Sequence, residues 1–155
     1  MIIGIDARIP KENKAGIAYT LNNIMPKMLE LDKENNYTLI GGGFETDNPQ
    51  VKIVPLNKYI IKVLLVLWRN IFWPSVDWFI GKTDVFLFTN FFDFPTSAKK
   101  KVVMIYDLAF VFFPQFAEKM NGPFLRAHVP RAIKRADKVI TISEAVKKEI
   151  VEYYK

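Results

Sequence analysis

Short apolar runs alternate along the chain with longer segments whose apolar residues recur every three or four positions. The short runs are rich in Ile, Val and Phe, which predicts strands buried within a sheet. They cover residues 2–5, 37–40, 51–54, 85–88, 102–105 and 139–142. The longer segments predict amphipathic helices, because that spacing places side chains on one helix face. They cover residues 16–31, 59–72, 121–135 and 144–154, the last with Ser143 as its N-cap.

This alternation predicts an α/β domain with a mainly parallel sheet flanked by helices. One connection leaves two possibilities, because the short loop between 37–40 and 51–54 suits a hairpin as well as a parallel pair. Ligands of parallel sheets bind beyond the carboxyl ends of the strands. We therefore expect the site among segments that directly follow strands, which are residues 6–16, 89–93, 106–110 and 143–144.

Composition and charge narrow the classes of function. The chain has 155 residues, a length that suits one domain over residues 1–155. It contains no Cys and one His, which excludes disulfides, Cys nucleophiles and His-pair metal sites. Its 22 Lys and Arg against 16 Asp and Glu give a net charge of +6. That excess favours an anionic partner: a nucleic acid, a phosphorylated small molecule or a membrane surface.

Candidates for chemistry stand at the predicted strand ends and helix starts. Gly16 begins a helix whose free N–H groups can meet a phosphate or a sugar hydroxyl, or it is simply a helix-starting glycine. Asp107 follows a very apolar strand, where a carboxylate can bind a hydroxyl, act as a base or cap a turn. Asn90 and Phe91 suit the hydroxyls and face of a sugar, and suit a packed loop equally well.

Aromatic and basic residues in the middle of the chain suggest a surface role. Lys58, Lys62 and Arg69 fall on one side of the predicted helix 59–72, beside a Trp cluster. Such a cluster stacks bases or anchors in lipid headgroups, with core packing expected for at least one of Trp68, Trp73 and Trp78. The predicted membrane-facing residues are Lys58, Lys62, Arg69, Trp68 and Trp73. For His128, inside a predicted helix, we expect packing or surface exposure rather than catalysis.

Four segments carry a family resemblance. They are Ile3-Gly4-Ile5-Asp6-Ala7-Arg8, Gly16-Ile17-Ala18-Tyr19, residues 102–110 with the ending Asp-Leu-Ala-Phe, and residues 129–144 with the ending Ala-Asp-Lys-Val-Ile-Thr-Ile-Ser-Glu. Together they resemble the N-terminal, Rossmann-like lobe of family-four retaining glycosyltransferases, which have the GT-B fold. The resemblance covers nearly the whole chain, and the last segment is the most specific.

The resemblance implies transfer of a sugar from a nucleotide-sugar to a glycan or lipid-linked acceptor, with retention and without a bound metal or cofactor. It implies that this lobe binds the acceptor and that Gly16 lies near the donor phosphates. Asp107 matches a catalytic position. The residues assigned to substrate binding are Gly16, Tyr19, Asn90, Phe91, Tyr106, Ser143 and Glu144.

Two departures from the family pattern change what we expect of the activity of this chain. Tyr106 stands where the family commonly has a His that contacts the donor sugar, and the C-terminal donor-binding lobe is not contained in the 155 residues. We therefore expect a fragment or subunit that is inactive alone, cytoplasmic, and peripheral on the cytoplasmic face of a membrane. The alternatives are a basic nucleic-acid-binding α/β module and a non-catalytic scaffold, which Tyr106 favours; no nucleic acid is expected for the leading hypothesis.

Overall fold

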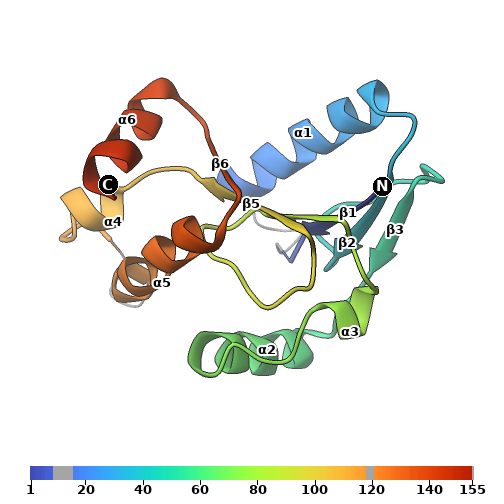
Figure 1. The fold of residues 1–155 in the computed structure, drawn as a ribbon, viewed down its shortest axis with the longest axis horizontal. Coiled ribbons are helices and arrows are strands. Elements are labelled where there is room, and N and C mark those ends of the chain that lie inside the picture. The colour runs from blue at the N-terminus through green and yellow to red at the C-terminus, as the bar shows by residue number, and fades with distance from the viewer. Residues whose placement is uncertain (9–15, 118–120, 155) are drawn as a thin grey trace.

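The computed structural model describes residues 1–8, 16–117 and 121–154 (Figure 1). Within them, six strands form one sheet in the order β3-β2-β1-β4-β5-β6, with every neighbouring pair parallel. The strands are β1 (Ile2–Asp6), β2 (Asn36–Ile40), β3 (Val51–Val54), β4 (Val85–Phe88), β5 (Lys100–Ile105) and β6 (Lys138–Thr141). The direction of strand progression reverses between β1 and β4, so this is a Rossmann-like fold. The predicted α/β class is confirmed.

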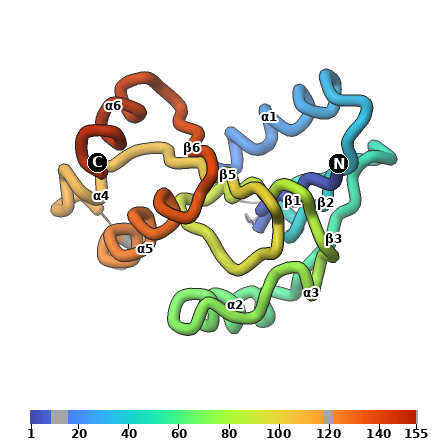
Figure 2. Tube along the Cα trace, in the orientation of Figure 1, coloured from blue at the N-terminus to red at the C-terminus, as the bar shows by residue number. Residues whose placement is uncertain are grey.

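Helices cover both faces of the sheet. They are α1 (Gly16–Leu31), α2 (Lys58–Asn70), α3 (Asp77–Ile80), α4 (Ala109–Phe112), α5 (Asn121–Arg135) and α6 (Glu144–Tyr153). Figures 1 and 2 show α1 on one side of the sheet and α2 with α3 on the other. The four longer helices confirm the predicted ones, although α2 ends at Asn70 instead of residue 72. The four-residue helices α3 and α4 were not predicted, because one turn is too short to show an apolar period.

Each face of the sheet has its own apolar core. On one face, α1 packs Leu21 and Met25 against Ile5 and Leu39 of the neighbouring strands. On the other face, α2 and α5 cover β4 and β5 around a group of buried rings, which are Trp68, Phe86, Phe88 and Phe94. Because both faces are covered, the central strands are apolar almost throughout, which is why they appear in the sequence as continuous apolar runs.

Gly4 in β1 makes room for one of these rings. A Cβ atom at Gly4 would lie 2.5 Å from Cδ2 of Phe86, on the adjacent strand. Phe86 is fully buried and its ring centroid lies 4.7 Å from that of Phe88. The glycine therefore lets β4 place a large ring against β1, at the centre of the sheet.

The pairing of β2 with β3 corrects the hairpin alternative. Tyr37 pairs with Val51 and Ile40 with Val54, so the two strands are parallel. The ten connecting residues, 41–50, form no helix or strand. Ten extended residues span up to about 33–36 Å, whereas a strand of five residues is about 17 Å long. The connection can therefore return along the strand without a helix, and the hairpin interpretation was wrong.

The length and hydropathy of the helices bear on membrane insertion. In the described part of the chain, no helix combines enough length with enough apolar character to cross a bilayer.

Candidate functional site

A cavity of about 470 Å³ lies beyond the carboxyl ends of β1 and β4. We call it the strand-edge cavity. Its polar lining consists of Arg8, Arg69 and Asn90, and the rest is apolar, contributed by α1, α2, α5 and the loop after β4. In doubly wound sheets, ligands bind at the point where the strand order reverses, and this cavity lies there. Its volume falls within the roughly 300–1,000 Å³ of small-molecule sites.

Arg8 is held at this cavity by a buried ion pair. Its Nε and one terminal nitrogen each donate to a different carboxylate oxygen of Asp6, both at 2.8 Å. The two side chains are only 5% and 3% exposed. This two-point pairing fixes the plane of the guanidinium, and among the described residues no hydrogen bond uses its remaining N–H donors. Arg8 is therefore a rigid cationic group in the cavity wall.

Three aromatic rings surround the same guanidinium. Its carbon lies 4.6 Å from the ring centroid of Phe94, 4.9 Å from Trp68 and 5.8 Å from Phe92. These distances are typical of cation–π contacts, which are favoured when the cation is desolvated. Sequence reasoning assigned Arg8 no role. The available signal was an arginine two residues after an acidic strand end, since both side chains then lie at the sheet edge.

Asn90 and Phe91 line the strand-edge cavity, as the sequence analysis expected for residues after β4. Within the described residues the Asn90 side-chain amide makes no hydrogen bond, so its donors and acceptor are available to a ligand. Phe91 has a φ of 58°, a left-handed conformation that is rare for a bulky residue. Strained backbone of this kind gathers at functional sites. The structure thus brings an unused amide and a strained aromatic residue together at the cavity.

Tyr106 lies behind the cavity wall rather than in it. Its hydroxyl donates to the carbonyl oxygen of Thr89 at 3.0 Å, and the side chain is 8% exposed. Burial, with a smaller contribution from the charge of Asp6, raises the pKa of Tyr106 to about 12. The phenol therefore stays protonated at neutral pH and joins the end of β5 to the end of β4. Its ring packs 5.4 Å from that of Phe91.

The other predicted residues at the β5 and β6 ends make local contacts with the helices that follow. Asp107 is exposed, and its carboxylate accepts the N–H of Ala109 at 2.9 Å. Ser143 caps α6 by accepting the N–H of Val146 at 3.2 Å, as predicted. Glu144 forms an exposed ion pair with Lys147. None of the three predicted residues is among those lining the strand-edge cavity.

The first turn of α1 also borders the strand-edge cavity. Gly16 begins the helix, as predicted, and no heavy atom among the described residues lies within 4 Å of the position its Cβ would take. Tyr19 is 69% exposed. Ile17, between them, lines the cavity. Residues 9–15 of the predicted site segment 6–16 lie outside the described residues.

The predicted membrane-facing group is only partly at the surface. Lys58, Lys62 and Trp73 are exposed on α2 and the segment after it. Trp68 is only 3% exposed, stacks on Phe94 at 4.2 Å and donates its indole N–H to a backbone carbonyl. The prediction that Trp68 faces a membrane was therefore wrong, and core packing of at least one Trp is confirmed. Arg69 is exposed but lines the cavity.

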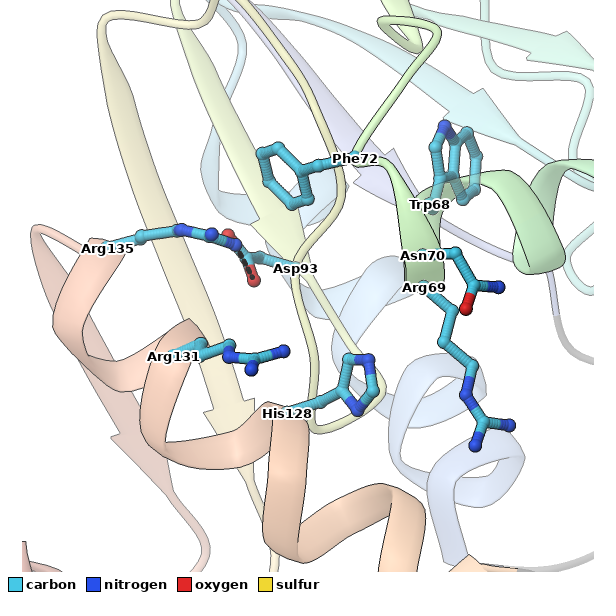
Figure 3. Close-up of a pocket in the computed structure, with 8 residues that line it drawn as sticks. All are labelled: Trp68, Arg69, Asn70, Phe72, Asp93, His128, Arg131 and Arg135. Carbon is cyan, nitrogen blue, oxygen red and sulfur yellow. Dashed lines mark ion pairs between the residues drawn. The ribbon is translucent and has the colours of Figure 1, made fainter.

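A second, smaller pocket of about 130 Å³ adjoins the first, with Arg69 lining both. We call it the arginine pocket (Figure 3). His128 lines it, stacks on Phe124 at a centroid distance of 4.1 Å and uses Nδ1 in a 2.9 Å hydrogen bond to the Phe124 carbonyl. The expected packing role of His128 is confirmed. Burial raises the pKa of Asp93, in the same pocket, and the charge of Arg135 opposes that shift.

Comparison with known proteins adds no family. No family model matches the chain, and a search of the curated proteins found no match. Among the residues that the structure describes, no group of three or more His, Asp or Glu side chains is placed to hold a metal ion. Fold and site together define a Rossmann-like α/β protein with a ligand-sized cavity at the switch point of its sheet.

Proposed function

We propose that this chain is the acceptor-binding lobe of a retaining, nucleotide-sugar-dependent glycosyltransferase with a GT-B fold. The observation that carries the proposal is the strand-edge cavity, with aromatic walls and only a few polar groups. A sugar ring has apolar C–H faces and a rim of hydroxyls. The Phe91 ring and aliphatic side chains such as Leu65 suit the faces, while the Asn90 amide and the Arg8 guanidinium suit the rim.

The positions of the resembling segments support the same proposal. The segment 3–8 ends in Arg8 and the segment 16–19 contains Ile17, and both residues line the cavity. The segment 102–110 contains Tyr106, whose ring packs against Phe91. Three stretches that are distant in sequence thus meet around one cavity, which is what a shared binding function requires.

Within the proposed enzyme, Asp107 and Tyr106 have different roles. Asp107 is exposed after β5, and among the described residues only Ala109 donates a hydrogen bond to its carboxylate, so we assign it the contact with substrate between two lobes. Tyr106 acts as a positioning residue, because its hydroxyl already donates to Thr89. The donor-sugar contact that the family assigns to a His is therefore supplied by another group.

The hydrogen bonding of Tyr106 and Asp107 within the protein also favours a second candidate, a non-catalytic scaffold with the same fold. Both Tyr106 and Asp107 make intramolecular hydrogen bonds, which leaves them less available for catalysis.

An activity assay on a complete enzyme distinguishes the glycosyltransferase from the scaffold. With the donor-binding lobe added, the glycosyltransferase proposal expects nucleotide release from UDP- or GDP-sugars. Asp107→Ala and Gly16→Val are then expected to abolish turnover. The chain alone is expected to be inactive, so transfer without added protein contradicts the single-lobe proposal.

Acceptor binding can be tested on the isolated chain by saturation-transfer NMR against a panel of sugars and lipid-linked sugar analogues. Val66 lines the strand-edge cavity, whereas Val63, one turn earlier on α2, does not. Both are well exposed, at 61% and 58%. We expect Val66→Trp to reduce acceptor binding at least tenfold and Val63→Trp to leave it unchanged. Equal binding by both variants would remove the cavity from the acceptor site.

Part of the proposal is docking on an anionic membrane surface. Exposed apolar side chains, including Tyr59, Val63 and Trp73, accompany Lys58 and Lys62 on α2 and the segment after it. Aromatic and aliphatic groups beside cations are typical of interfacial binding. We expect the chain to co-sediment with anionic vesicles at low salt and to dissociate at high salt.

A matched pair of double variants tests this docking. Lys58→Gln with Lys62→Gln removes two cations from the proposed surface, and Lys147→Gln with Lys148→Gln removes two from α6. The first pair is expected to lose co-sedimentation and the second to keep it. Absence of wild-type co-sedimentation at low salt would contradict the docking.

A further inference from the structure

The arginine pocket gathers more positive charge than its own residues neutralise. Arg69 of α2 and Arg131 and Arg135 of α5 line it together with a single carboxylate, Asp93. Three guanidinium groups against one carboxylate leave an excess of two positive charges. Gathering like charges costs free energy, and a bound anion would remove that cost.

The two helices present these groups from opposite sides. Figure 3 shows His128, Arg131 and Arg135 extending from α5 toward the side where α2 carries Trp68 and Arg69. The α5 residues follow one another at spacings of three and four, so they lie on one helix face. Sequence reasoning missed this face, although the spacing itself was the available signal.

Arg135 is anchored, whereas Arg131 is not. The guanidinium of Arg135 lies 3.6 Å from the Asp93 carboxylate and 4.1 Å from the ring centroid of Phe72. Asp93 is itself only 9% exposed, so the pair is held from within the protein. Arg131 has no hydrogen bond or ion pair with any described residue. The pocket therefore contains one guanidinium that the protein holds, that of Arg135, and one without a described partner, that of Arg131.

His128 adds a buried polar atom without a partner. The Phe124 carbonyl can only accept a hydrogen bond, so Nδ1 of His128 carries a proton. Its Nε2 is buried and has no partner among the described residues. A buried ring nitrogen without a partner is unfavourable. A phosphate oxygen accepts hydrogen bonds, so Nε2 would bind it as an N–H donor in the imidazolium form, which carries a proton on both ring nitrogens.

We propose that the arginine pocket binds a tetrahedral oxyanion, namely inorganic phosphate or the terminal phosphate of a phosphomonoester. Arg131 and Arg135 present two guanidinium groups from one face of α5, and each can engage a different pair of oxygens of such a group. The volume of about 130 Å³ is also suitable, since a cavity of about 150 Å³ holds benzene, which has more heavy atoms than phosphate. A phosphomonoester carries about two negative charges at neutral pH, which matches the excess of positive charge.

The phosphate proposal does not depend on the glycosyltransferase proposal. Its main residues lie on α5 and on the loop that contains Asp93, and none of them has a role in the proposed sugar transfer. Arg69 also lines the strand-edge cavity, so the two pockets are neighbours.

His128 provides a direct readout, because it is the chain's single His and its imidazole proton resonances are unique. The full chain is titrated with inorganic phosphate at fixed pH, with sodium chloride keeping the ionic strength constant. We expect saturable shifts of the His128 resonances and a matching binding isotherm by calorimetry. Chloride alone is expected to cause no saturable shift. Absence of a saturable response to phosphate would overturn the proposal.

Two variants on the same helix separate a specific site from general attraction. Arg131→Gln is expected to weaken phosphate binding at least tenfold, whereas Lys134→Gln, which removes the same charge but does not line the pocket, is expected to change it less than twofold. Equal weakening by both would overturn the proposal. Arg131→Lys keeps the charge without the fork, and an intermediate loss is expected. Arg131 is exposed and without described partners, so these variants should fold, which circular dichroism checks.

Two further titrations identify the source of the phosphate. Glucose 1-phosphate represents a soluble phosphorylated metabolite, and a short-chain phosphatidic acid represents a lipid headgroup. The ligand that shifts His128 at lower concentration than inorganic phosphate is the better match. Retention of the wild-type shift by Arg131→Gln with both ligands would count against the pocket.

Discussion

The carboxyl edge of the sheet differs on its two sides. At the ends of β1 and β4, Arg8 and Asn90 face a cavity. At the ends of β5 and β6, Asp107 and Ser143 use their oxygens to accept backbone N–H groups of the following helices. A polar residue after a strand therefore becomes a cap where a helix begins within two residues. It remains available to a ligand where the chain continues as a loop, as it does after β4.

This difference leads to a ranking of stability effects. The cavity side depends on a buried ion pair and on a close backbone contact, while the capping side depends on exposed hydrogen bonds. Buried charges and backbone strain have larger consequences than exposed caps. We therefore expect substitutions to matter more on the cavity side.

The largest effect is expected at Asp6. Asp6→Ala leaves the buried Arg8 guanidinium unpaired, and removing one partner of a buried pair costs about 3–5 kcal/mol. Urea unfolding measures the change in the free energy of unfolding. Asp107→Ala is the control, with an expected cost of at most about 2 kcal/mol. An equal loss at the two positions would contradict the comparison.

Gly41 is expected to rank second. Its φ is +108°, and an added Cβ would lie 2.6 Å from the carbonyl oxygen of Ala7, directly before Arg8. We expect Gly41→Ala to lower the free energy of unfolding by about 1–3 kcal/mol, because the backbone must shift or remain strained. Gly42→Ala is the matched control, since its Cβ would meet no atom within 4 Å. Thermal unfolding should separate the two variants clearly, and similar melting temperatures would show that the contact is not needed.

On the capping side, Ser143→Ala is expected to cost about 1 kcal/mol, because the N–H of Val146 loses its acceptor. Ser143→Asp should retain most of the stability, since Asp is an equally good N-cap. Acceptor and phosphate binding are expected to remain unchanged in both. Loss of binding in Ser143→Asp would instead give Ser143 a role in a ligand site.

The smallest effect concerns Tyr106 and alkaline pH. Burial raises the pKa of Tyr106 to about 12 from an unfolded value near 10. The contribution of the protonated Tyr106 to the free energy of unfolding is therefore complete below pH 10 and is lost as the pH rises toward 12. Tyr106→Phe removes this pH dependence and, through the lost hydrogen bond to Thr89, costs about 0.5–1.5 kcal/mol at neutral pH.

Tyrosinate absorbance and urea unfolding at pH 9 and above measure these two changes. Tyr37 also has a pKa raised to about 12, by burial and by its hydrogen bond to Asp32. Tyr37→Phe therefore removes another late titration. A loss of absorbance change near pH 10 instead of near pH 12 in Tyr106→Phe would show that the phenol is not buried in solution.

Local patterns were enough to predict the elements and the fold class. Continuous apolar runs identified the six described strands, and in the central strands the run reflects burial on both faces of the sheet. The three-and-four spacing identified the long helices, and Ser143 identified the start of α6. The residue pair Asn90–Phe91 was also predicted at the cavity, since it directly follows a central strand. These features depend only on residues near in sequence.

The sequence by itself thus determined which segments form strands and helices and that ligands belong at the carboxyl edge. Only the tertiary structure decided which polar side chains remain free there. It buried Trp68, made β2 and β3 parallel and placed Arg69 and Arg131 in the lining of one pocket. The physical reason is that hydrogen-bond partners, burial and charge neighbours come from segments far apart along the chain, whereas apolar periodicity is a local property.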